Sequence, residues 1–339
     1  MSGRSFAVVI PTYNMSSFLD DLWASLVASG VVDFATEILV VDDASSDDTV
    51  AHLESIRAKD VLAAQKLRVL ALKTNAGRFG ARFAGAKEAQ GDDILFLDTR
   101  LTLGPEFGAN LEKARSEHRS IVGSVDIDTT RNVFCLYWDR SHKFMFRKHY
   151  AHAHAPIVLT PSNYDEFLKG TTVFYVPRDV FLASCEVFKD RGLLNDDTFL
   201  MKHIVETCPI TVHPEVRIKW VPRENFREFV YRMWDRGPSF VEYHVFEHRG
   251  FLFKVTMASL AGAAATGLLL VFVPPVGWVV VGGATAALIL STFALTRSPS
   301  EAIRMVPVHV ATVGAFGAGI VRGLGVNLAK QIMQRHQTA

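Results

Sequence analysis

Four clusters of polar residues lie within the first hundred positions, and each follows a short apolar run. They are Pro11-Thr12-Tyr13-Asn14, Asp42-Asp43, Asn75 to Arg82, and Asp98-Thr99-Arg100. Carboxylates accept hydrogen bonds from a base imide or a ribose, and a tyrosine ring offers a face for stacking. Arginines where a helix opens favour the charge of a pyrophosphate, and Asp98 suits a divalent cation that bridges a diphosphate.

Apolar runs and helical patterns alternate around these clusters. Strands are predicted over Phe6–Ile10, Glu37–Val41, Leu67–Leu72 and Asp93–Leu97. Helices are predicted from Ser16, over Ser46–Ile56 and over Gly80–Ala89. Alternation of helices with fully apolar strands is typical of a parallel α/β sheet, in which ligands bind outside the carboxyl ends of the strands. We therefore predict one shared site, although each cluster taken singly is also compatible with turn, cap or solvated loop residues.

Charge in the chain is nearly balanced, with 36 Lys and Arg residues against 35 Asp and Glu residues. This balance excludes nucleic-acid binding by a strongly basic face. The mean hydropathy of +0.18 is high for a chain in which 21% of residues are charged. The cause is local, because the 42 residues from Val255 to Thr296 include no Asp, Glu, Lys or Arg.

Two apolar runs, Phe251–Val273 and Val276–Leu295, are each long enough to cross a bilayer as a helix. Pro274-Pro275 between them predicts a tight turn, and hence a transmembrane hairpin; the alternative is a buried hairpin in a soluble core. Basic residues flank both ends of the pair: Arg249, Lys254, Arg297 and Arg304. By the positive-inside rule, both ends face the cytoplasm in a multi-pass protein of the cell membrane.

The segments on either side of the hairpin carry weaker signals. Met305–Val321 has no Asp, Glu, Lys or Arg but is short for a span, so we favour a membrane-surface segment over a third span. Between Phe226 and Trp234, apolar residues recur at helical spacing among arginines, which predicts an amphipathic helix suited to a membrane interface or to the core. The predicted divisions are 1–222 for the α/β domain, 223–250 for the amphipathic juxtamembrane helix, 251–297 for the hairpin and 298–339 for a membrane-associated segment.

The polar clusters and their strands resemble those of family 2 glycosyltransferases with the GT-A fold. The resemblance rests on Val9 to Asn14, Val40 to Thr49, Asn75 to Arg78 and Leu95 to Asp98. It implies a Rossmann-like, mostly parallel sheet and the inverting transfer of a sugar from a nucleotide-diphosphate donor, usually with Mg²⁺ or Mn²⁺. The donor-binding residues that it implies are Pro11, Thr12, Tyr13, Asp42, Asp43, Arg78 and Asp98.

One position departs from the pattern of the resembled family. Its members usually carry Asp-x-Asp after the fourth strand, whereas this chain has Asp98-Thr99-Arg100. In one interpretation Arg100 binds the donor diphosphate itself, so that a cation is weakly bound or unnecessary. In the other, Asp98 holds the Mg²⁺ or Mn²⁺ with further ligands, of which His213 is a candidate. An arginine beside a cation is electrostatically unfavourable unless a phosphate lies between them.

Later motifs resemble the acceptor side of the same family. The acidic pair Asp196-Asp197 resembles the motif that supplies the general base, which removes the acceptor proton as the oxygen attacks the anomeric carbon. Asp197 is the first candidate and Asp196 the second, and a helix cap is the alternative role for either. Tyr231 to Gly237 resembles, imperfectly, an Arg/Gln-x-x-Arg-Trp element, so Arg232 or Arg236 would stabilise the departing diphosphate.

Together these features predict a membrane-anchored glycosyltransferase that uses a nucleotide sugar at the cytoplasmic face. The predicted acceptor is a hydroxyl of a lipid-linked molecule, because the hairpin would hold the site at the bilayer. A polyprenyl phosphate is the alternative acceptor, and it would need no general base. From a different class, the missing second carboxylate leaves open a non-catalytic scaffold that binds nucleotide sugars. An oligomer is compatible with each of these functions.

Overall fold

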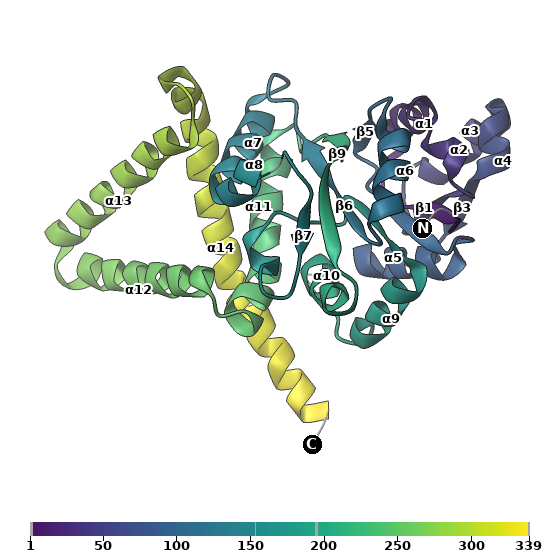
Figure 1. The fold of residues 1–339 in the computed structure, drawn as a ribbon. Helices are drawn as coiled ribbons and strands as arrows, with labels where there is room; N and C mark the ends of the chain where they lie inside the picture. The colour runs from purple at the N-terminus through teal and green to yellow at the C-terminus, as the bar shows by residue number, and fades with distance from the viewer. Residues whose placement is uncertain (1–2, 153, 194–195, 338–339) are drawn as a thin grey trace. The chain divides into compact units, whose positions relative to one another are not determined.

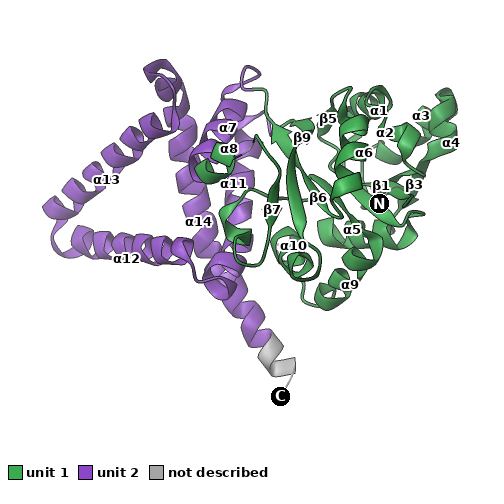
Figure 2. Cartoon of the chain, viewed as in Figure 1, with its two compact units in different colours: residues 1–128, 146–192, 196–221 green, residues 129–145, 193–195, 222–339 purple. Residues whose placement is uncertain are grey.

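The computed structural model describes residues 3–152, 154–193 and 196–337, and the chain separates into two compact units (Figure 2). Unit 1 comprises residues 1–128, 146–192 and 196–221, and unit 2 comprises residues 129–145, 193–195 and 222–339. The last segment of unit 1 therefore ends next to residue 222, where the sequence places the end of the α/β domain. Residues 129–145, which lie before that boundary in the sequence, pack with unit 2.

Unit 1 is built on a mixed sheet, whose described strands are nine in number and run in the order β3-β2-β1-β4-β8-β6-β9-β5, with β7 paired to β9 (Figure 1). The strands are β1 (Phe6–Thr12), β2 (Ile38–Asp42), β3 (Leu67–Ala71), β4 (Asp93–Leu97), β5 (Leu101–Leu103), β6 (Ile121–Asp126), β7 (Ile157–Leu159), β8 (Val173–Pro177) and β9 (Ile210–Trp220). Neighbours from β3 to β4 are parallel, as predicted. Beyond β4 the sheet is mixed, because β8 is antiparallel to both β4 and β6 while β6 and β9 are parallel.

Helices connect these strands and cover the sheet. They are α1 (Leu19–Ala28), α2 (Val31–Phe34), α3 (Thr49–Lys59), α4 (Val61–Lys66), α5 (Gly77–Glu88), α6 (Phe107–Glu117), α8 (Arg147–His152), α9 (Arg178–Phe188) and α10 (Asp196–Thr207). Alternate residues of β1 explain the two layers: Val8 belongs to the core that includes residues of α1 and α6, whereas Val9 lies against α5. Gly85 permits this second contact, because a Cβ there would lie 2.5 Å from Val9 Cγ1 and 2.8 Å from Val41 Cγ2.

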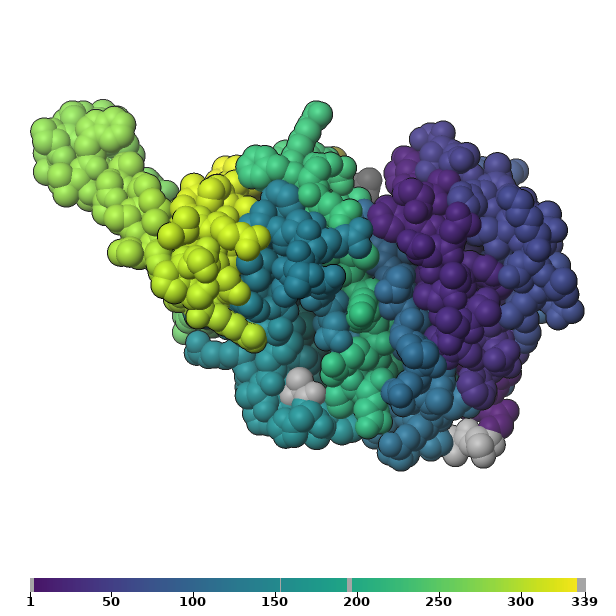
Figure 3. Space-filling model, turned by 90° about the horizontal axis from the view of Figure 1, so that it is seen from above, coloured from purple at the N-terminus to yellow at the C-terminus, as the bar shows by residue number. Residues whose placement is uncertain are grey.

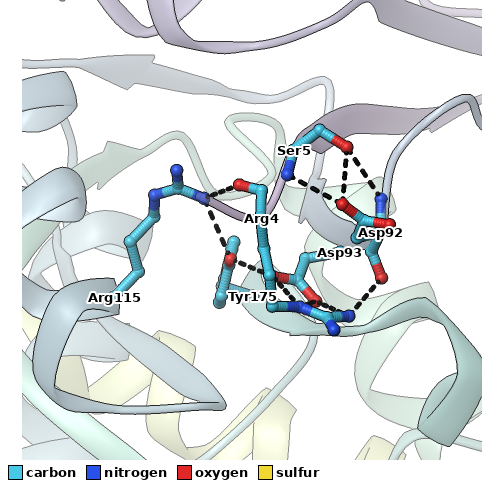
Figure 4. A network of polar contacts seen from close by, with 6 residues as sticks. All are labelled: Arg4, Ser5, Asp92, Asp93, Arg115 and Tyr175. Carbon is cyan, nitrogen blue, oxygen red and sulfur yellow. Dashed lines mark hydrogen bonds and ion pairs between the residues drawn. The ribbon is translucent and has the colours of Figure 1, made fainter. Parts of the chain in front are cut away.

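A polar network fixes the edge of the sheet where β1 and β4 begin (Figure 4). Asp93, which is buried, accepts hydrogen bonds from the Arg4 guanidinium at 2.7 Å and from the Tyr175 hydroxyl at 2.5 Å. Arg115 donates to both the Tyr175 hydroxyl and the Arg4 carbonyl oxygen. Burial and the Asp93 carboxylate raise the pKa of Tyr175, so its hydroxyl stays protonated and continues to donate. The network thus joins β1, β4, β8 and α6 at one end of the sheet.

Unit 2 is helical in the residues described: α7 (Val133–Met145), α11 (Phe226–Val241), the π-helix Glu242–Glu247, α12 (Phe251–Phe272), α13 (Pro274–Leu295) and α14 (Pro299–Gln337). The turn predicted at Pro274-Pro275 is confirmed, since α12 ends at Phe272 and Pro274 opens α13. In the space-filling view the yellow-green hairpin of α12 and α13 projects as an arm from the yellow α14 (Figure 3). By length and composition, α12, α13 and the Pro299–Met333 part of α14 are each able to cross a membrane.

The amphipathic helix predicted between Phe226 and Trp234 is α11. Its apolar face is partly a core face, because Phe229 is buried with its ring 5.1 Å from that of Phe134 and in edge contact with Tyr137 of α7. Phe226 and Tyr231 remain exposed on the same helix. The core role is confirmed for Phe229, and a membrane-interface role for the exposed residues of α11 remains a prediction.

Glycines bring α11 and α14 into backbone contact. A Cβ on Gly237 would lie 2.0 Å from the Gly319 carbonyl carbon, and a Cβ on Gly319 would lie 2.3 Å from the Trp234 carbonyl oxygen. About two turns later on α14, Asn327 Nδ2 donates to the Pro238 carbonyl oxygen at 3.1 Å. The same carbonyl oxygen accepts from the Glu242 N–H at the end of α11, so the Asn327 amide adds a hydrogen bond between the two helices.

We predict that Gly319→Ala lowers the free energy of unfolding by about 1–2 kcal/mol, because the new methyl group must push α14 away from α11. Gly314→Ala in the same helix is the matched control: a Cβ there meets nothing within 4 Å. Because alanine favours helix more than glycine does, this control should be neutral or stabilising by up to about 1 kcal/mol. Thermal unfolding of the full chain in detergent measures both variants, and equal midpoints would contradict the close packing.

Candidate active site

The structure brings together the strand-end clusters predicted to share a site. Thr12 and Asp42 are register partners where β1 and β2 end, and the Asp43 N–H donates to the Thr12 carbonyl oxygen at 2.9 Å. The Thr99 hydroxyl, after β4, donates to the Pro11 carbonyl oxygen at 3.2 Å. The residues that follow β1, β2 and β4 are thus hydrogen-bonded to one another at one edge of the sheet.

The loops after β1 and β2 are rigidly joined. Asn14 and Ala44 both adopt left-handed backbone conformations, with φ of 52° and 59°. The Asn14 N–H donates to the Ser45 hydroxyl, and its side-chain oxygen accepts from the Ser46 N–H, both at 2.8 Å. These conformations cost energy in residues other than glycine, and the cross-loop hydrogen bonds offset it. Tyr13, which precedes Asn14, is 46% exposed, so its ring is open to a stacking ligand.

The two adjacent aspartates after β2 have different surroundings. Asp43 Oδ1 accepts a hydrogen bond of 2.6 Å from the Ala76 N–H, so this carboxylate holds the start of α5. Burial raises the pKa of Asp43, while hydrogen bonds from the Ala76 and Gly77 amides oppose that shift. Asp43 therefore ties the loop before α5 to the end of β2, and its contact with a nucleoside remains a prediction.

One carboxylate oxygen of Asp42 accepts no hydrogen bond from any described residue. Its Oδ2 accepts from the Ser45 N–H at 3.1 Å, whereas Oδ1 is buried and has no hydrogen-bond partner among the described residues. The Thr12 hydroxyl, on the neighbouring strand, is buried and unpartnered in the same sense. A buried polar atom without a partner costs about 1–3 kcal/mol, which a ligand N–H would recover. Contact between Asp42 and a nucleobase remains a prediction.

A buried arginine joins the predicted donor and acceptor carboxylates. Arg82, on α5, is 4% exposed; its Nη1 donates to Asp197 Oδ1 at 2.9 Å, and its Nη2 lies 3.6 Å from Asp98 Oδ1. Asp98 is fixed in turn, because its N–H donates to the Thr172 carbonyl oxygen at 3.2 Å. Asp98 at the end of β4 and Asp197 at the start of α10 are thus both ion-paired to one guanidinium.

Sequence reasoning grouped Arg82 with the arginines that open a helix toward a pyrophosphate, and this placement was wrong. The side chain lies one turn inside α5 and points into the protein, on the buried stripe that also contains Ala81, Gly85 and Ala86. Small residues at helical spacing mark the face that packs on the sheet, and this spacing was the available signal. Arg78, by contrast, is exposed in the first turn of α5, as expected for a diphosphate ligand.

Arg100, a predicted ligand of the donor diphosphate, contacts other parts of unit 1. Its Nε donates to the Val221 carbonyl oxygen at 3.0 Å, and its guanidinium lies 4.6 Å above the Phe18 ring. These contacts attach the turn between β4 and β5 to the end of β9. Contact between Arg100 and a diphosphate remains a prediction.

The residues present do not fit a cation held by the protein alone. No group of three or more His, Cys, Asp or Glu side chains in the described part of the chain is arranged to hold a metal. The proposed partner of Asp98, His213, has its described contacts with Glu215 and His118 instead. Asp98 itself already faces the Arg82 guanidinium. The structure therefore does not bring Asp98 and His213 together.

The acceptor-side aspartates open α10. The Asp196 side chain lies outside the described part of the structure. Asp197 is held through its carboxylate by Arg82, and the next residue is held through its backbone, because the buried Tyr164 hydroxyl donates to the Thr198 carbonyl oxygen at 2.7 Å. Arg232 and Arg236 lie on α11 in unit 2, where Arg232 pairs with Asp235 at 3.3 Å, and their role toward a diphosphate stays a prediction.

Lys169 is enclosed beside Tyr164. Its amine donates to the Tyr164 carbonyl oxygen and lies 3.8 Å from the centroid of the Tyr164 ring. Burial lowers the pKa of Lys169 to about 8, with Asp165 opposing the shift and Lys202 adding to it. Lys169 thus supports the tyrosine that holds the first turn of α10.

Comparison with known families agrees with this site. Residues 7–162 match the profile described as glycosyl transferase family 2. The matched part contains the ends of β1, β2 and β4, with Asp42, Arg82 and Asp98. This part, just under half of the chain, is similar to glycosyltransferase family 2.

Individual relatives each match about a third of this chain. Over 118 residues it is 33% identical to the poly(ribitol-phosphate) β-N-acetylglucosaminyltransferase TarS of Staphylococcus aureus, covering 34% of this chain and 20% of TarS. Over 120 residues it is 36% identical to an undecaprenyl-phosphate 4-deoxy-4-formamido-L-arabinose transferase of Sodalis glossinidius, covering 35% of this chain and 36% of that one. The aligned stretches thus span well under half the length of these relatives.

A solved structure supports the fold over a longer range. The mannosyltransferase PcManGT of Pyrobaculum calidifontis, in complex with GDP-Man and Mn²⁺, has a TM-score of 0.54 and 16% sequence identity. The match covers 96% of this chain and 87% of that one. At this identity the likeness shows that the two share a fold, the GT-A fold expected from the sequence.

Lys169 makes a testable prediction about pH. Between about pH 8 and its unfolded pKa of about 10.4, the unfolded chain binds more protons at this residue than the folded chain, so raising the pH stabilises the fold. We expect the loss of unfolding free energy in Lys169→Met, relative to wild type, to be larger at pH 10 than at pH 7.5, by up to about 3 kcal/mol. Denaturant unfolding of both proteins at the two pH values measures this difference. A difference that does not change with pH would contradict the burial of a charged amine.

Proposed function

We propose that the protein transfers a sugar from a nucleoside-diphosphate sugar to a lipid-linked acceptor hydroxyl at the cytoplasmic face of a membrane, with inversion at the anomeric carbon. The observation that carries this proposal is the convergence of Asp98 and Asp197 on Arg82. It pairs a carboxylate from the strand ends of the family 2 region with the carboxylate at the start of α10. Transfer needs the donor and acceptor groups to lie close to each other.

The donor is proposed to lie across the ends of β1, β2 and β4. Asp42 Oδ1 would accept from the imide or lactam N–H of uracil or guanine, and Tyr13 would stack on the base. Arg78, in the first turn of α5, would meet the diphosphate, where the helix start also favours negative charge. Support comes from relatives whose names include N-acetylglucosaminyltransferase, β-glucosyltransferase and undecaprenyl-phosphate transferase activities.

Asp197 is proposed as the general base. Its carboxylate would take the proton of the acceptor hydroxyl while the oxygen forms a bond to the anomeric carbon. The bond from that carbon to the diphosphate oxygen breaks on the opposite face, and the nucleoside diphosphate leaves with the electron pair. Arg232 and Arg236 are proposed to stabilise the charge of that leaving group, as expected from the sequence.

No step of the proposed reaction is assigned to a cation. Family relationship makes Mg²⁺ or Mn²⁺ plausible, and a cation would supply positive charge to the diphosphate when bound. The described residues offer Asp98 for this purpose, and that carboxylate is shared with Arg82. We therefore propose that arginine side chains supply the positive charge that this chain itself offers to the diphosphate.

Anchoring by the C-terminal helices is proposed to hold the site at the bilayer. The three candidate spans lie in unit 2, and the windows of α12 and α13 are almost wholly exposed, as lipid-facing helices would be. Basic residues at both ends of the hairpin favour the cytoplasmic side for those ends. An acceptor carried by a lipid would be concentrated at that surface.

A polyprenyl phosphate is the second candidate acceptor, favoured by the names of two relatives, an undecaprenyl-phosphate transferase and a dolichyl-phosphate β-glucosyltransferase. A phosphate monoanion or dianion attacks without losing a proton to the protein, so the general base would be dispensable. The two candidates therefore differ in what they require of Asp197.

Asp197→Asn separates the two candidates. With a hydroxyl acceptor we expect turnover to fall by about 10²–10⁴-fold while donor binding is retained. The full chain in detergent is incubated with UDP-glucose, UDP-N-acetylglucosamine or GDP-mannose, and either undecaprenyl phosphate or a membrane lipid extract. The control is Asp33→Asn, an exposed aspartate on α2, which should leave turnover unchanged.

Each outcome of this experiment has one meaning. Turnover that survives Asp197→Asn with undecaprenyl phosphate supports the phosphate acceptor and removes Asp197 from the chemistry. Donor binding without turnover under any condition supports the non-catalytic scaffold and contradicts the proposed transfer.

A further inference from the structure

Arg82 is buried while both of its carboxylate partners are open to a ligand. The guanidinium is 4% exposed, whereas the side chains of Asp98 and Asp197 are 34% and 28% exposed. The cation therefore lies behind the two carboxylates, on the protein side of the site. A side chain in this position does not meet the substrates directly, but it determines where the carboxylates point.

The geometry of the two ion pairs links the carboxylates to each other. Asp197 is bound through Nη1 at 2.9 Å and Asp98 faces Nη2 at 3.6 Å, so the two partners use different nitrogens of one planar group. Because a guanidinium is rigid, a rotation that shortens one contact moves the other nitrogen as well. A lysine in its place would keep the charge but offer a single point of attachment.

The helix that carries Arg82 has little freedom to adjust. Gly85, one turn later on α5, lies so close to Val9 and Val41 of the sheet that a Cβ would clash with their methyl groups. The Asp43 carboxylate holds the start of the same helix through the Ala76 N–H. On the other side, the Tyr164 hydroxyl holds the backbone at Thr198. Arg82 and Asp197 thus approach each other from two separately fixed elements.

The charges of the group also matter to the donor. Asp98 and Asp197 together carry two negative charges, which would repel a diphosphate, and Arg82 offsets one of them at close range. Removal of Arg82 leaves two neighbouring carboxylates without this cation. Neighbouring like charges favour protonation of a carboxylate, which is the unfavourable state for a general base.

We propose that Arg82 is a positioning residue for the reaction: it orients the Asp197 carboxylate toward the acceptor and couples that orientation to Asp98 on the donor side. This inference rests on the proposed transfer to a hydroxyl acceptor. Arg82 touches neither donor nor acceptor and acts through the two aspartates. A donor group that displaces Asp98 would in this way alter the hold on Asp197 before the acceptor reacts.

Arg82→Lys and Arg82→Gln test this role in the full chain, with the donor and acceptor pair that gives turnover in the panel above. We expect Arg82→Lys to bind the donor within about threefold of wild type but to lower kcat by about 10–100-fold, because the charge remains and the two-point fork is lost. In Arg82→Gln, the acid limb of the kcat profile should move to higher pH. The matched control is Arg115→Lys, which replaces a largely buried arginine of the network at the opposite edge of the sheet and should leave kcat and its pH profile unchanged.

Asp98→Asn provides a second test that does not depend on the folding of an Arg82 variant. With residue 98 neutral, Asp197 is the one remaining negative partner of Arg82 in this pair of contacts. The acid limb of the kcat profile, measured at saturating donor, should therefore move to lower pH, whereas in Arg82→Gln it should move to higher pH. Limbs that stay in place in both variants, or a kcat unchanged in Arg82→Lys, would overturn the positioning role. Failure of the proposed function looks different, since Asp197→Asn would then retain turnover or the wild-type chain would show none.

Discussion

A buried arginine requires negative partners, and the candidate site is arranged around that requirement. Arg82 is enclosed in unit 1, where an unpaired cation would be strongly destabilising. Its partners come from far apart in the chain: Asp98 follows β4, and Asp197 opens α10, 115 residues after Arg82. Because Arg82 pairs with both carboxylates, the proposed donor and acceptor sides of the site lie next to each other.

The rest of unit 1 supplies the rigidity that this charge balance needs. Parallel strands deliver Thr12, Asp42 and Asp98 to one edge of the sheet, and hydrogen bonds between their loops fix them there. At the other edge, the buried Asp93 ties β1 and β4 to Tyr175 of β8. Close contact at Gly85 seats α5 on the sheet between these two ends. Small displacements of α5 would therefore break packing as well as ion pairs.

The sequence was sufficient for the local features of this fold. Apolar runs that end at polar clusters correctly predicted β1, β2 and β4, and the proline pair correctly predicted the turn between α12 and α13. Parts that depend on distant partners were not predictable in the same way. The packing of α7 with unit 2 comes from aromatic contacts with α11, and the antiparallel place of β8 depends on pairing with β4 across about eighty residues. The contact of Asp43 with the loop before α5 and the role of Arg82 as a shared counter-charge likewise arise only from tertiary neighbours.

The central claim is that the strand ends bind a nucleoside diphosphate, with arginine rather than a resident cation balancing the carboxylates. The most direct measurement is the unfolding temperature of the full chain, in EDTA, with UDP, GDP, ADP or CDP and the corresponding nucleotide sugars. We predict that a uridine or guanosine diphosphate raises the midpoint by several degrees without added cation, as saturating ligands of the folded state do. The shift should shrink in Asp42→Asn, since an amide has a single acceptor oxygen and both the Ser45 N–H and the base need one. A midpoint unmoved by every nucleotide, or moved only when Mn²⁺ is added, would contradict the account.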